Sequence, residues 1–261
     1  MGDDRGVRRP IAVLLVALLT LIGVGAGGLL DSAKADGLTD LLKLLEPTTT
    51  TTTKPKPKPP VQPYTRLATP PGDVATYDKP NGTQVGVAGH WYGYQQTMPI
   101  VGSQNGWLKV RLPERPNGKT AWIRAANVKI TRTPYRIVIR RGSTNLTLYK
   151  DGYPQFTVPV GLGVAKTPTP LGSFYIGVIE HDEGPAYGPF QLNTTGHSEA
   201  IQSWEGSGDA VTSIHGPISA KSDKQIGSTG TYISNGCVRM HRDDLHRLWM
   251  VPLGTPVDIV Q

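Results

Sequence analysis

At 261 residues, the chain is long enough for one large domain or for two small ones joined by flexible segments. Its 31 glycines and 23 prolines, together with only 7% aromatic residues, disfavour long helices and favour turn-rich β structure. The formal net charge is +7, and six of the cations lie in two short clusters before residue 59 (Arg5, Arg8, Arg9, Lys54, Lys56 and Lys58), outside any region expected to fold, so no basic groove for nucleic acid is inferred. The basic segment is better suited to a tether beside an anionic envelope polymer or a membrane.

An apolar run covers residues 11–30 and follows Arg8 and Arg9. Its 20 residues match the roughly 20 that a helix needs to span a bilayer. The small-x-small triplet at residues 33–35 is typical of a signal-peptidase site. Residues 1–35 therefore predict export, and the choice between a cleaved signal peptide and a retained membrane anchor stays open.

A low-complexity spacer occupies residues 36–63, with a threonine run at 48–53 and alternating lysines and prolines at 54–60. Such proline spacing favours extended polyproline II, which gains about 3.1 Å per residue. The segment cannot bury a core, but it can hold a domain away from a membrane.

Short strands and tight turns are predicted for residues 64–131. Residues 107–111 and 120–123 alternate apolar and polar side chains, and the Asn-Gly pairs at 81–82 and 117–118 predict type I′ hairpin turns. With the segments at 72–77, 106–110 and 121–123, this region resembles a bacterial Src-homology-3-like barrel. Its tryptophans, Trp107 and Trp122, are expected in core packing rather than in a ligand groove.

A second β-rich unit is predicted from residue 134 to residue 261. Expected strands lie at residues 135–139, 145–149, 153–160, 173–179 and 256–260, with an Asp-Gly turn at 151–152. A short helix is predicted at 243–250, because Leu245, Leu248 and Trp249 would share one face.

The single cysteine, Cys237, excludes an intramolecular disulfide. A lone cysteine is often only a small buried apolar residue. As a nucleophile it would need a base to generate the thiolate, and His215 is the candidate. Gly236 would let a substrate carbonyl approach the backbone closely, and the amides beside Cys237 are candidate oxyanion donors.

Residues 214–216 (IHG) and 234–240 (SNGCVRM) resemble the signature of the L,D-transpeptidase catalytic domain, also called YkuD-like. Residues 167–174, 187–190 and 254–257 also match motifs of that family in the expected order. The resemblance extends over residues 135–260. It implies a mainly β fold in which a small barrel precedes a β-sandwich-like catalytic domain.

The resemblance also implies a reaction. Cys237 would attack the amide between the third residue and D-Ala of a peptidoglycan tetrapeptide stem, giving a thioester that a second stem amine resolves as a 3→3 cross-link. His215 would be the base, and the Gly216 carbonyl would orient its imidazole in place of a triad carboxylate. The amides of Gly236 and Cys237 would form the oxyanion hole.

Further site residues follow from the same resemblance. Arg239 would brace the loop or meet a substrate carboxylate, with bracing favoured. Ser234, Asn235 and Tyr187 are expected to contact substrate. Carbapenem-type β-lactams are expected to acylate Cys237. The histidine spacing does not suit zinc, so neither a metal nor another cofactor is expected.

One hypothesis does not depend on the family. Residues 180–214 carry six acids and no lysine or arginine. Some of these carboxylates are hypothesised to attract the amine of the acceptor stem, although a solvated acidic loop explains the pattern equally well.

Three other functions fit the same residues. An L,D-carboxypeptidase would resolve the thioester with water, and a protein-anchoring transpeptidase would use a polypeptide amine. A non-catalytic envelope-binding protein would leave the work to residues 64–131, and the intact pair of His215 and Cys237 argues against it.

Overall fold

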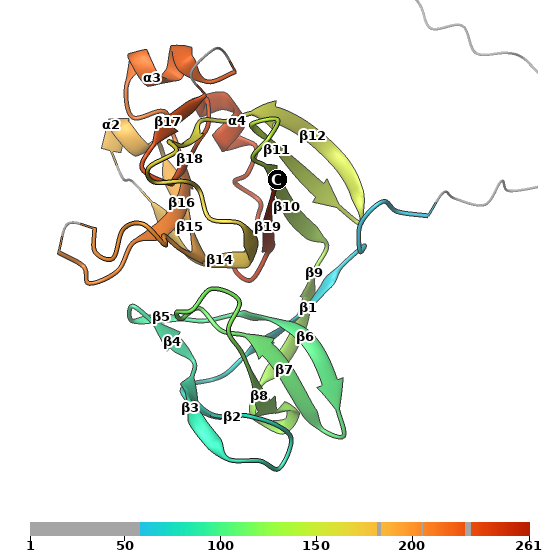
Figure 1. Cartoon of the computed structure of the whole chain (residues 1–261). Helices are drawn as coiled ribbons and strands as arrows, with labels where there is room; N and C mark the ends of the chain where they lie inside the picture. The colour runs from blue at the N-terminus through green and yellow to red at the C-terminus, as the bar shows by residue number, and fades with distance from the viewer. Residues whose placement is uncertain (1–57, 182–183, 205, 228–230) are drawn as a thin grey trace, which may run out of the picture. The chain divides into compact units, whose positions relative to one another are not determined.

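The computed structural model describes residues 58–181, 184–204, 206–227 and 231–261, which belong to one compact unit. Two large sheets dominate it, so the predicted mainly β fold is confirmed (Figure 1). The predicted export segment and residues 36–57 of the predicted spacer lie outside the described residues. Within the ranges that are described, no helix is long and apolar enough to cross a membrane.

The first sheet is seven-stranded, in the order β3-β2-β8-β7-β6-β1-β9, and a small hairpin of β4 and β5 stands beside it. The strands predicted at 107–111 and 120–123 are confirmed as β7 and β8. These strands are consistent with the predicted Src-homology-3-like barrel, which stays a prediction. The elements are β1 (Thr65–Thr69), β2 (Val74–Tyr77), β3 (Gln84–Ala88), β4 (His90–Trp91), β5 (Tyr94–Gln95), β6 (Met98–Gln104), β7 (Trp107–Arg111), β8 (Thr120–Arg124), the 3-10 turn η2 (Ala125–Asn127) and β9 (Lys129–Thr133).

The prediction of type I′ turns at residues 81–82 and 117–118 is wrong. A type I′ turn needs positive φ at both central residues, whereas only Asn81 has it in the first pair and only Gly118 in the second. Residues 105–106 carry the required pair of angles, with φ of 44° and 80°. They close the β6–β7 hairpin, in which Gln104 pairs with Trp107.

The second sheet is eight-stranded, in the order β12-β11-β10-β19-β14-β15-β16-β18. The predicted strands of this unit are confirmed within a few residues, and the turn at 151–152 joins β11 to β12. The pair β13 and β17 forms a separate two-stranded ladder. The elements are β10 (Tyr135–Arg140), β11 (Asn145–Lys150), β12 (Tyr153–Pro159), β13 (Leu162–Gly163), β14 (Gly172–His181), α2 (Gly184–Tyr187), β15 (Phe190–His197), β16 (Val211–His215), α3 (Ala220–Gln225), β17 (Tyr232–Ser234), β18 (Val238–Arg239), α4 (Arg242–His246) and β19 (Pro256–Val260).

The last helix is shorter than predicted, since α4 ends at His246. Leu245 and Leu248 are buried as expected, but Trp249 is 57% exposed. After α4 the chain continues in tight turns, with the Leu248 amide bonded to the Leu245 carbonyl. These i→i+3 bonds rotate the following residue away from the helical face.

The two sheets share buried packing through Tyr175 of β14. Its ring is fully buried and belongs to the apolar cluster inside the first sheet. Its hydroxyl donates to Gln96 Oε1 at 3.1 Å, and Gln96 Nε2 donates to the Gly177 carbonyl at 3.2 Å. A Cβ on Gly177 would lie 2.7 Å from the Trp91 ring. A residue of the second sheet therefore completes the core of the first.

Candidate active site

The candidate base, His215, ends β16, and the candidate nucleophile, Cys237, directly precedes the neighbouring strand β18. Strands β16 and β18 are parallel, and their register pairs Ile214 with Val238 and His215 with Arg239. Ile214 and Val238 are fully buried in the core. Because alternate residues of a strand face opposite sides, His215, Cys237 and Arg239 share the other face of the sheet.

The imidazole of His215 is 2% exposed and is held by the next residue. Its Nδ1 lies 2.7 Å from the Gly216 carbonyl oxygen. A carbonyl only accepts hydrogen bonds, so Nδ1 carries the proton and Nε2 is left as an acceptor. Burial lowers the pKa of His215 to about 4; the Arg239 charge acts in the same direction, and the Gly216 carbonyl opposes it.

The thiol of Cys237 is partly exposed. Burial of its surroundings raises its pKa above the ordinary value of 9.0, while the Ser213 amide and the Arg239 charge act in the opposite direction. With the pKa of His215 lowered and that of Cys237 raised, both groups are neutral at neutral pH. These two directions favour a neutral thiol and a neutral imidazole over an ion pair in the resting site.

A tight turn presents Cys237. Gly236 has φ of 119°, in the region that favours glycine. Its amide donates to Ser234 Oγ at 3.1 Å, and that hydroxyl donates to the Cys237 carbonyl at 2.6 Å. Ser234 is buried and holds the turn together. Of the two amides predicted for the oxyanion hole, Gly236 already has an acceptor, and that of Cys237 has none among the described residues.

The loop predicted from the Thr-Pro motif lies against this turn. The Val164 amide donates to the Ser234 carbonyl at 2.9 Å. A Cβ on Gly163 would lie 2.2 Å from the Thr167 carbonyl oxygen and 2.9 Å from the Gly236 Cα. This close approach requires glycine at residue 163, and the loop packs against the turn that contains Gly236.

Tyr187 stands over the base. Its ring centroid is 4.8 Å from that of His215 in an edge-on arrangement. The Gly216 amide donates to the Tyr187 carbonyl at 2.7 Å, and the Ile218 amide donates to the Ala186 carbonyl at 2.9 Å. A Cβ on Gly216 would lie 2.8 Å from the Tyr187 oxygen, so this approach also requires glycine.

Arg239 braces the site through its main chain. Its amide and carbonyl each form a 2.8 Å hydrogen bond with Gly161. Its side-chain Nε is buried and has no hydrogen-bond partner in the part of the chain that the structure describes. The guanidinium interacts electrostatically with Cys237 and Tyr187. Asn235, beside the nucleophile in the sequence, is exposed.

Two of the acids in residues 180–214 bind other side chains of the protein. Glu180 Oε2 accepts hydrogen bonds from Gln191 and Asn193, both at 2.6 Å, and Asp209 forms an ion pair with Arg115 at 2.7 Å. Glu199 is exposed. The other three acids, Asp182, Glu183 and Glu205, lie outside the described residues. Glu180 and Asp209 thus have internal partners, which narrows the hypothesis that this segment attracts an amine.

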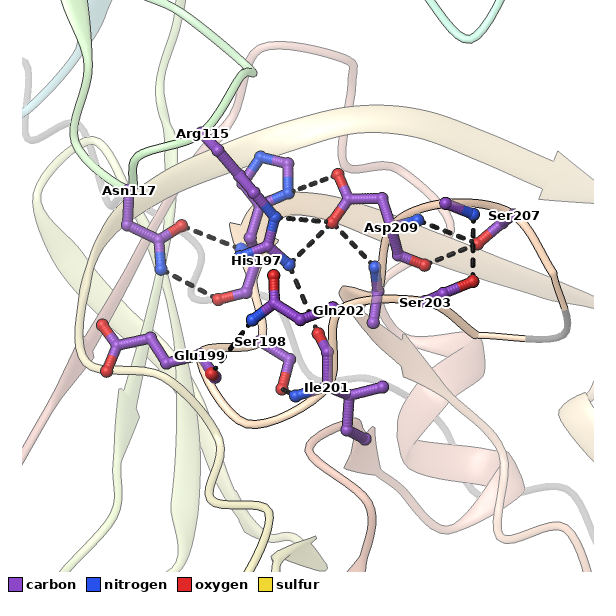
Figure 2. A network of polar contacts seen from close by, with 12 residues as sticks. Arg115, Asn117, His197, Ser198, Glu199, Ile201, Gln202, Ser203, Ser207 and Asp209 are labelled. Carbon is purple, nitrogen blue, oxygen red and sulfur yellow. Dashed lines mark hydrogen bonds and ion pairs between the residues drawn. The ribbon is translucent and has the colours of Figure 1, made fainter.

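A set of long-range polar contacts is not apparent from the sequence. Asn117, predicted only as a turn residue, binds the backbone of His197, and Arg115 binds Asp209 (Figure 2). No local pattern points to these long-range pairs. Among the described residues, no three His, Cys, Asp or Glu side chains gather as a metal set.

Comparison with known proteins identifies the second unit. Residues 134–259 match the family model of the YkuD L,D-transpeptidase catalytic domain. Relatives from Bacillus subtilis and Bacillus licheniformis, each named a candidate L,D-transpeptidase YkuD, are 31% identical over 127 residues. That match covers 48% of this chain and 66% of each relative, just under two thirds of their length.

Two solved structures are also similar to the chain. An Enterococcus faecium L,D-transpeptidase mutant is 23% identical, with a TM-score of 0.36, over 48% of this chain and 49% of that one. L,D-transpeptidase 3 from Mycobacterium tuberculosis, solved with a faropenem-derived adduct, is 15% identical, with a TM-score of 0.39, over 56% of this chain and 69% of that one. Residues 134–259 of this chain therefore match the L,D-transpeptidase catalytic-domain family, both in the family model and in the Bacillus relatives.

Proposed function

We propose that the protein is a peptidoglycan L,D-transpeptidase that forms 3→3 cross-links through a thioester on Cys237. The observation that carries the proposal is the placement of His215 and Cys237 on one face of adjacent strands, with the imidazole oriented by the Gly216 carbonyl. The match of residues 134–259 to the L,D-transpeptidase family model supports the choice of peptidoglycan stem peptides as the substrate class.

In the first half-reaction, the Cys237 sulfur attacks the carbonyl carbon of the third stem residue. The thiol proton passes to His215 Nε2, which the Nδ1 bond to Gly216 leaves free to accept it. The negative oxygen of the tetrahedral intermediate lies at the Cys237 amide. When the carbon–nitrogen bond breaks, the imidazolium returns the proton to the leaving D-Ala amine.

In the second half-reaction, an amine of another stem attacks the thioester. His215 removes a proton from the attacking amine, and the Cys237 thiolate leaves and is reprotonated from the imidazolium. No carboxylate orients the imidazole; the neutral Gly216 carbonyl does so. The base therefore stays uncharged between turnovers, which suits a cycle that must deprotonate a thiol and then an amine.

The side chain of Arg239 is proposed to bind the terminal carboxylate of the donor stem. Its Nε is buried without a described partner, and a guanidinium forms charge-assisted bonds with carboxylates. Bracing, the alternative role, is carried by its main-chain bonds to Gly161. A carboxylate bound there would place the scissile amide close to Cys237.

The remaining predicted residues take different roles. Ser234 is proposed to act by holding the nucleophile turn, since its hydroxyl is occupied by that turn. Tyr187 is proposed to cover the imidazole and bound substrate, and the exposed Asn235 to contact one of the stems. The Gly236 amide would join the oxyanion hole only if it exchanged Ser234 Oγ for the oxyanion.

Two further properties follow from the proposed reaction. A β-lactam carbonyl offers the same target to the sulfur, so carbapenem-type compounds should acylate Cys237; the M. tuberculosis structure holds a faropenem-derived adduct. Because peptidoglycan lies outside the cytoplasm, the enzyme is proposed to act in the cell wall. Residues 1–35 would serve as a cleaved signal or as an anchor, ahead of the spacer at 36–63 and units at 64–131 and 134–261.

The test is a product assay with the purified full-length protein and disaccharide tetrapeptides. Mass spectrometry should detect a dimer that has lost one D-Ala, and the Cys237→Ala variant should give none. Release of D-Ala without a dimer would establish a carboxypeptidase instead. Transfer only to an added protein amine would indicate anchoring, and an inactive wild type that binds sacculi would support an envelope-binding protein.

A further inference from the structure

A partly buried polar network joins the two sheets at the start of β16, away from Cys237. It connects the β7–β8 hairpin, residues 112–119, to the end of β15 and to the loop at residues 198–210 (Figure 2). We name this network the junction and define it by Arg115, Asn117, His197 and Asp209.

Asp209 is the hub of the junction. Its Oδ1 accepts hydrogen bonds from Arg115 Nε at 2.9 Å and from the Ala210 amide at 2.7 Å. Its Oδ2 accepts one from the Tyr92 hydroxyl at 3.0 Å. Burial pushes the pKa of Asp209 upward, but the Ala210 amide, Arg115, His197 and Tyr92 outweigh it, so the pKa is lowered. Asp209 is thus a carboxylate held by groups from both sheets.

His197 is held as firmly and is 1% exposed. Its Nε2 lies 2.6 Å from the Pro113 carbonyl oxygen, and its Nδ1 forms an ion-pair contact of 2.7 Å with Asp209 Oδ2. The Asn117 amide group also grips the His197 backbone, donating to its carbonyl at 2.8 Å and accepting from its amide at 2.9 Å. The hairpin thus fixes both the side chain and the main chain of the last residue of β15.

The junction fixes the start of the strand that carries the base. Strands β15 and β16 pair regularly at Asn193 and Ser213, and then the register shifts so that His197 pairs with Val211. Such a bulge leaves β15 residues unpaired, so the strand needs other contacts to keep its register. Val211 begins β16, which continues through Ser213, whose amide faces the Cys237 thiol, to His215.

We propose that Arg115 and Asn117 are positioning residues of the catalytic site, which hold β16 in register through His197 and Asp209. The hairpin at 112–119 is then part of the catalytic unit and not only of a separate barrel. An error of about 1 Å in the position of a reacting group can cost about 100-fold in rate. Because β16 ends at His215, loosening the junction should displace His215 and change the reactivity of the Cys237 thiol.

The test compares full-length Arg115→Ala and Asn117→Ala with Lys119→Ala as the matched control. Lys119 belongs to the same hairpin but pairs only with the exposed Glu114. The first readout is the rate of Cys237 alkylation by iodoacetamide across pH, which requires no peptidoglycan substrate. The second readout is kcat and KM for a tetrapeptide donor, which rests on the proposed function.

Both junction variants should be alkylated at a rate changed by about 3- to 10-fold, with a displaced pH midpoint, and kcat should fall more than KM rises. Arg115→Lys should recover part of the loss, and Lys119→Ala should match the wild type. If Arg115→Ala does not fold, the test rests on Asn117→Ala, which leaves the Arg115–Asp209 ion pair intact. Wild-type alkylation rates and midpoints in a folded junction variant would overturn the proposal. A wild type that makes no product while the alkylation difference persists would overturn the proposed function alone.

Discussion

Two buried histidines at opposite ends of the β15–β16 pair serve different purposes. The His215 imidazole feels the charge of Arg239, and its Nδ1 donates a hydrogen bond to the neutral Gly216 carbonyl. His197 lies beside the Asp209 carboxylate, and a carbonyl faces its other ring nitrogen. Among the described residues, His215 Nε2 has no hydrogen-bond partner, whereas His197 Nδ1 contacts Asp209 Oδ2 at 2.7 Å as an ion pair without forming a hydrogen bond of good geometry.

The difference lies in the partners and not in the burial, since both rings are almost fully enclosed. A neutral acceptor fixes the orientation of an imidazole without stabilising its charge, so the ring stays basic and uncharged. A carboxylate fixes the orientation and holds the ring in an ion-pair network. The first arrangement suits proton transfer, and the second suits structure.

The largest expected effect is the loss of acylation rate when His215, the proposed base, is replaced. His215→Gln removes the proposed base and should lower the acylation rate by about 100- to 10,000-fold. The measurement is the rate of adduct formation with a carbapenem. The exposed His246→Gln serves as the control and should react like the wild type. A loss below about tenfold would show that His215 is not the base.

The pH dependence of the thiol tests whether the resting pair is neutral. Since the pKa of Cys237 is raised above 9.0 and that of His215 is lowered to about 4, no thiolate–imidazolium pair should form between them. Alkylation by iodoacetamide should then rise with pH and reach its midpoint on the alkaline side. A plateau from pH 5 to 8, as an ion pair gives, would contradict this reading.

Acid should remove the stabilising contributions of His215 and Asp209 in two different pH ranges. His215 is protonated in the unfolded chain below its usual pKa of 6.5 but resists protonation in the fold down to about 4. Stability is therefore lost as pH falls through that window, by roughly 3 kcal/mol. The lowered pKa of Asp209 acts in a lower window, because its contribution is lost only below its ordinary value of 3.8.

Denaturant titrations at several pH values measure the difference. His215→Gln should remove most of the slope between pH 6.5 and 4 and leave the loss below 3.8 in place. An unchanged slope would mean that His215 is protonated in the fold at mildly acidic pH.

The smallest expected effect concerns the nucleophile turn. Ser234→Ala would leave the buried Gly236 amide without its acceptor and should cost about 1–3 kcal/mol of unfolding free energy. Acylation should slow as well, because the turn that presents Cys237 is no longer held. Ser103→Ala, which removes an exposed hydroxyl that has no side-chain hydrogen bond among the described residues, should cost less than about 0.5 kcal/mol. Equal costs in both variants would deny Ser234 its bracing role.

The elements that the sequence predicted well are those set by local pattern. Alternation located β7, β8 and the strands of the second sheet, and the motif around Cys237 pointed to residues that the fold brings together on one face. Turn chemistry was less reliable. Of the four Asn-Gly pairs (81–82, 105–106, 117–118 and 235–236), only residues 105–106 have positive φ at both positions.

The junction and the shared core were beyond prediction for one physical reason. Asn117 and His197 are distant in sequence, and so are Tyr175 and Gln96, so no local periodicity links them. Asp209 counted only as one of six acids, whereas its partners come from both sheets. The helix at α4 ended early because the tight turns after it follow the packing of Leu248 and not helix propensity.

The central claim, that Cys237 carries the acyl group, is tested most directly by intact-protein mass spectrometry. Full-length enzyme is incubated with a tetrapeptide donor whose side-chain amine is blocked, so that no stem can serve as acceptor. The account predicts an adduct equal to the donor less D-Ala, located on Cys237 by peptide mapping and absent in Cys237→Ala. Release of D-Ala by the Cys237→Ala variant, or an adduct on another residue, would contradict it.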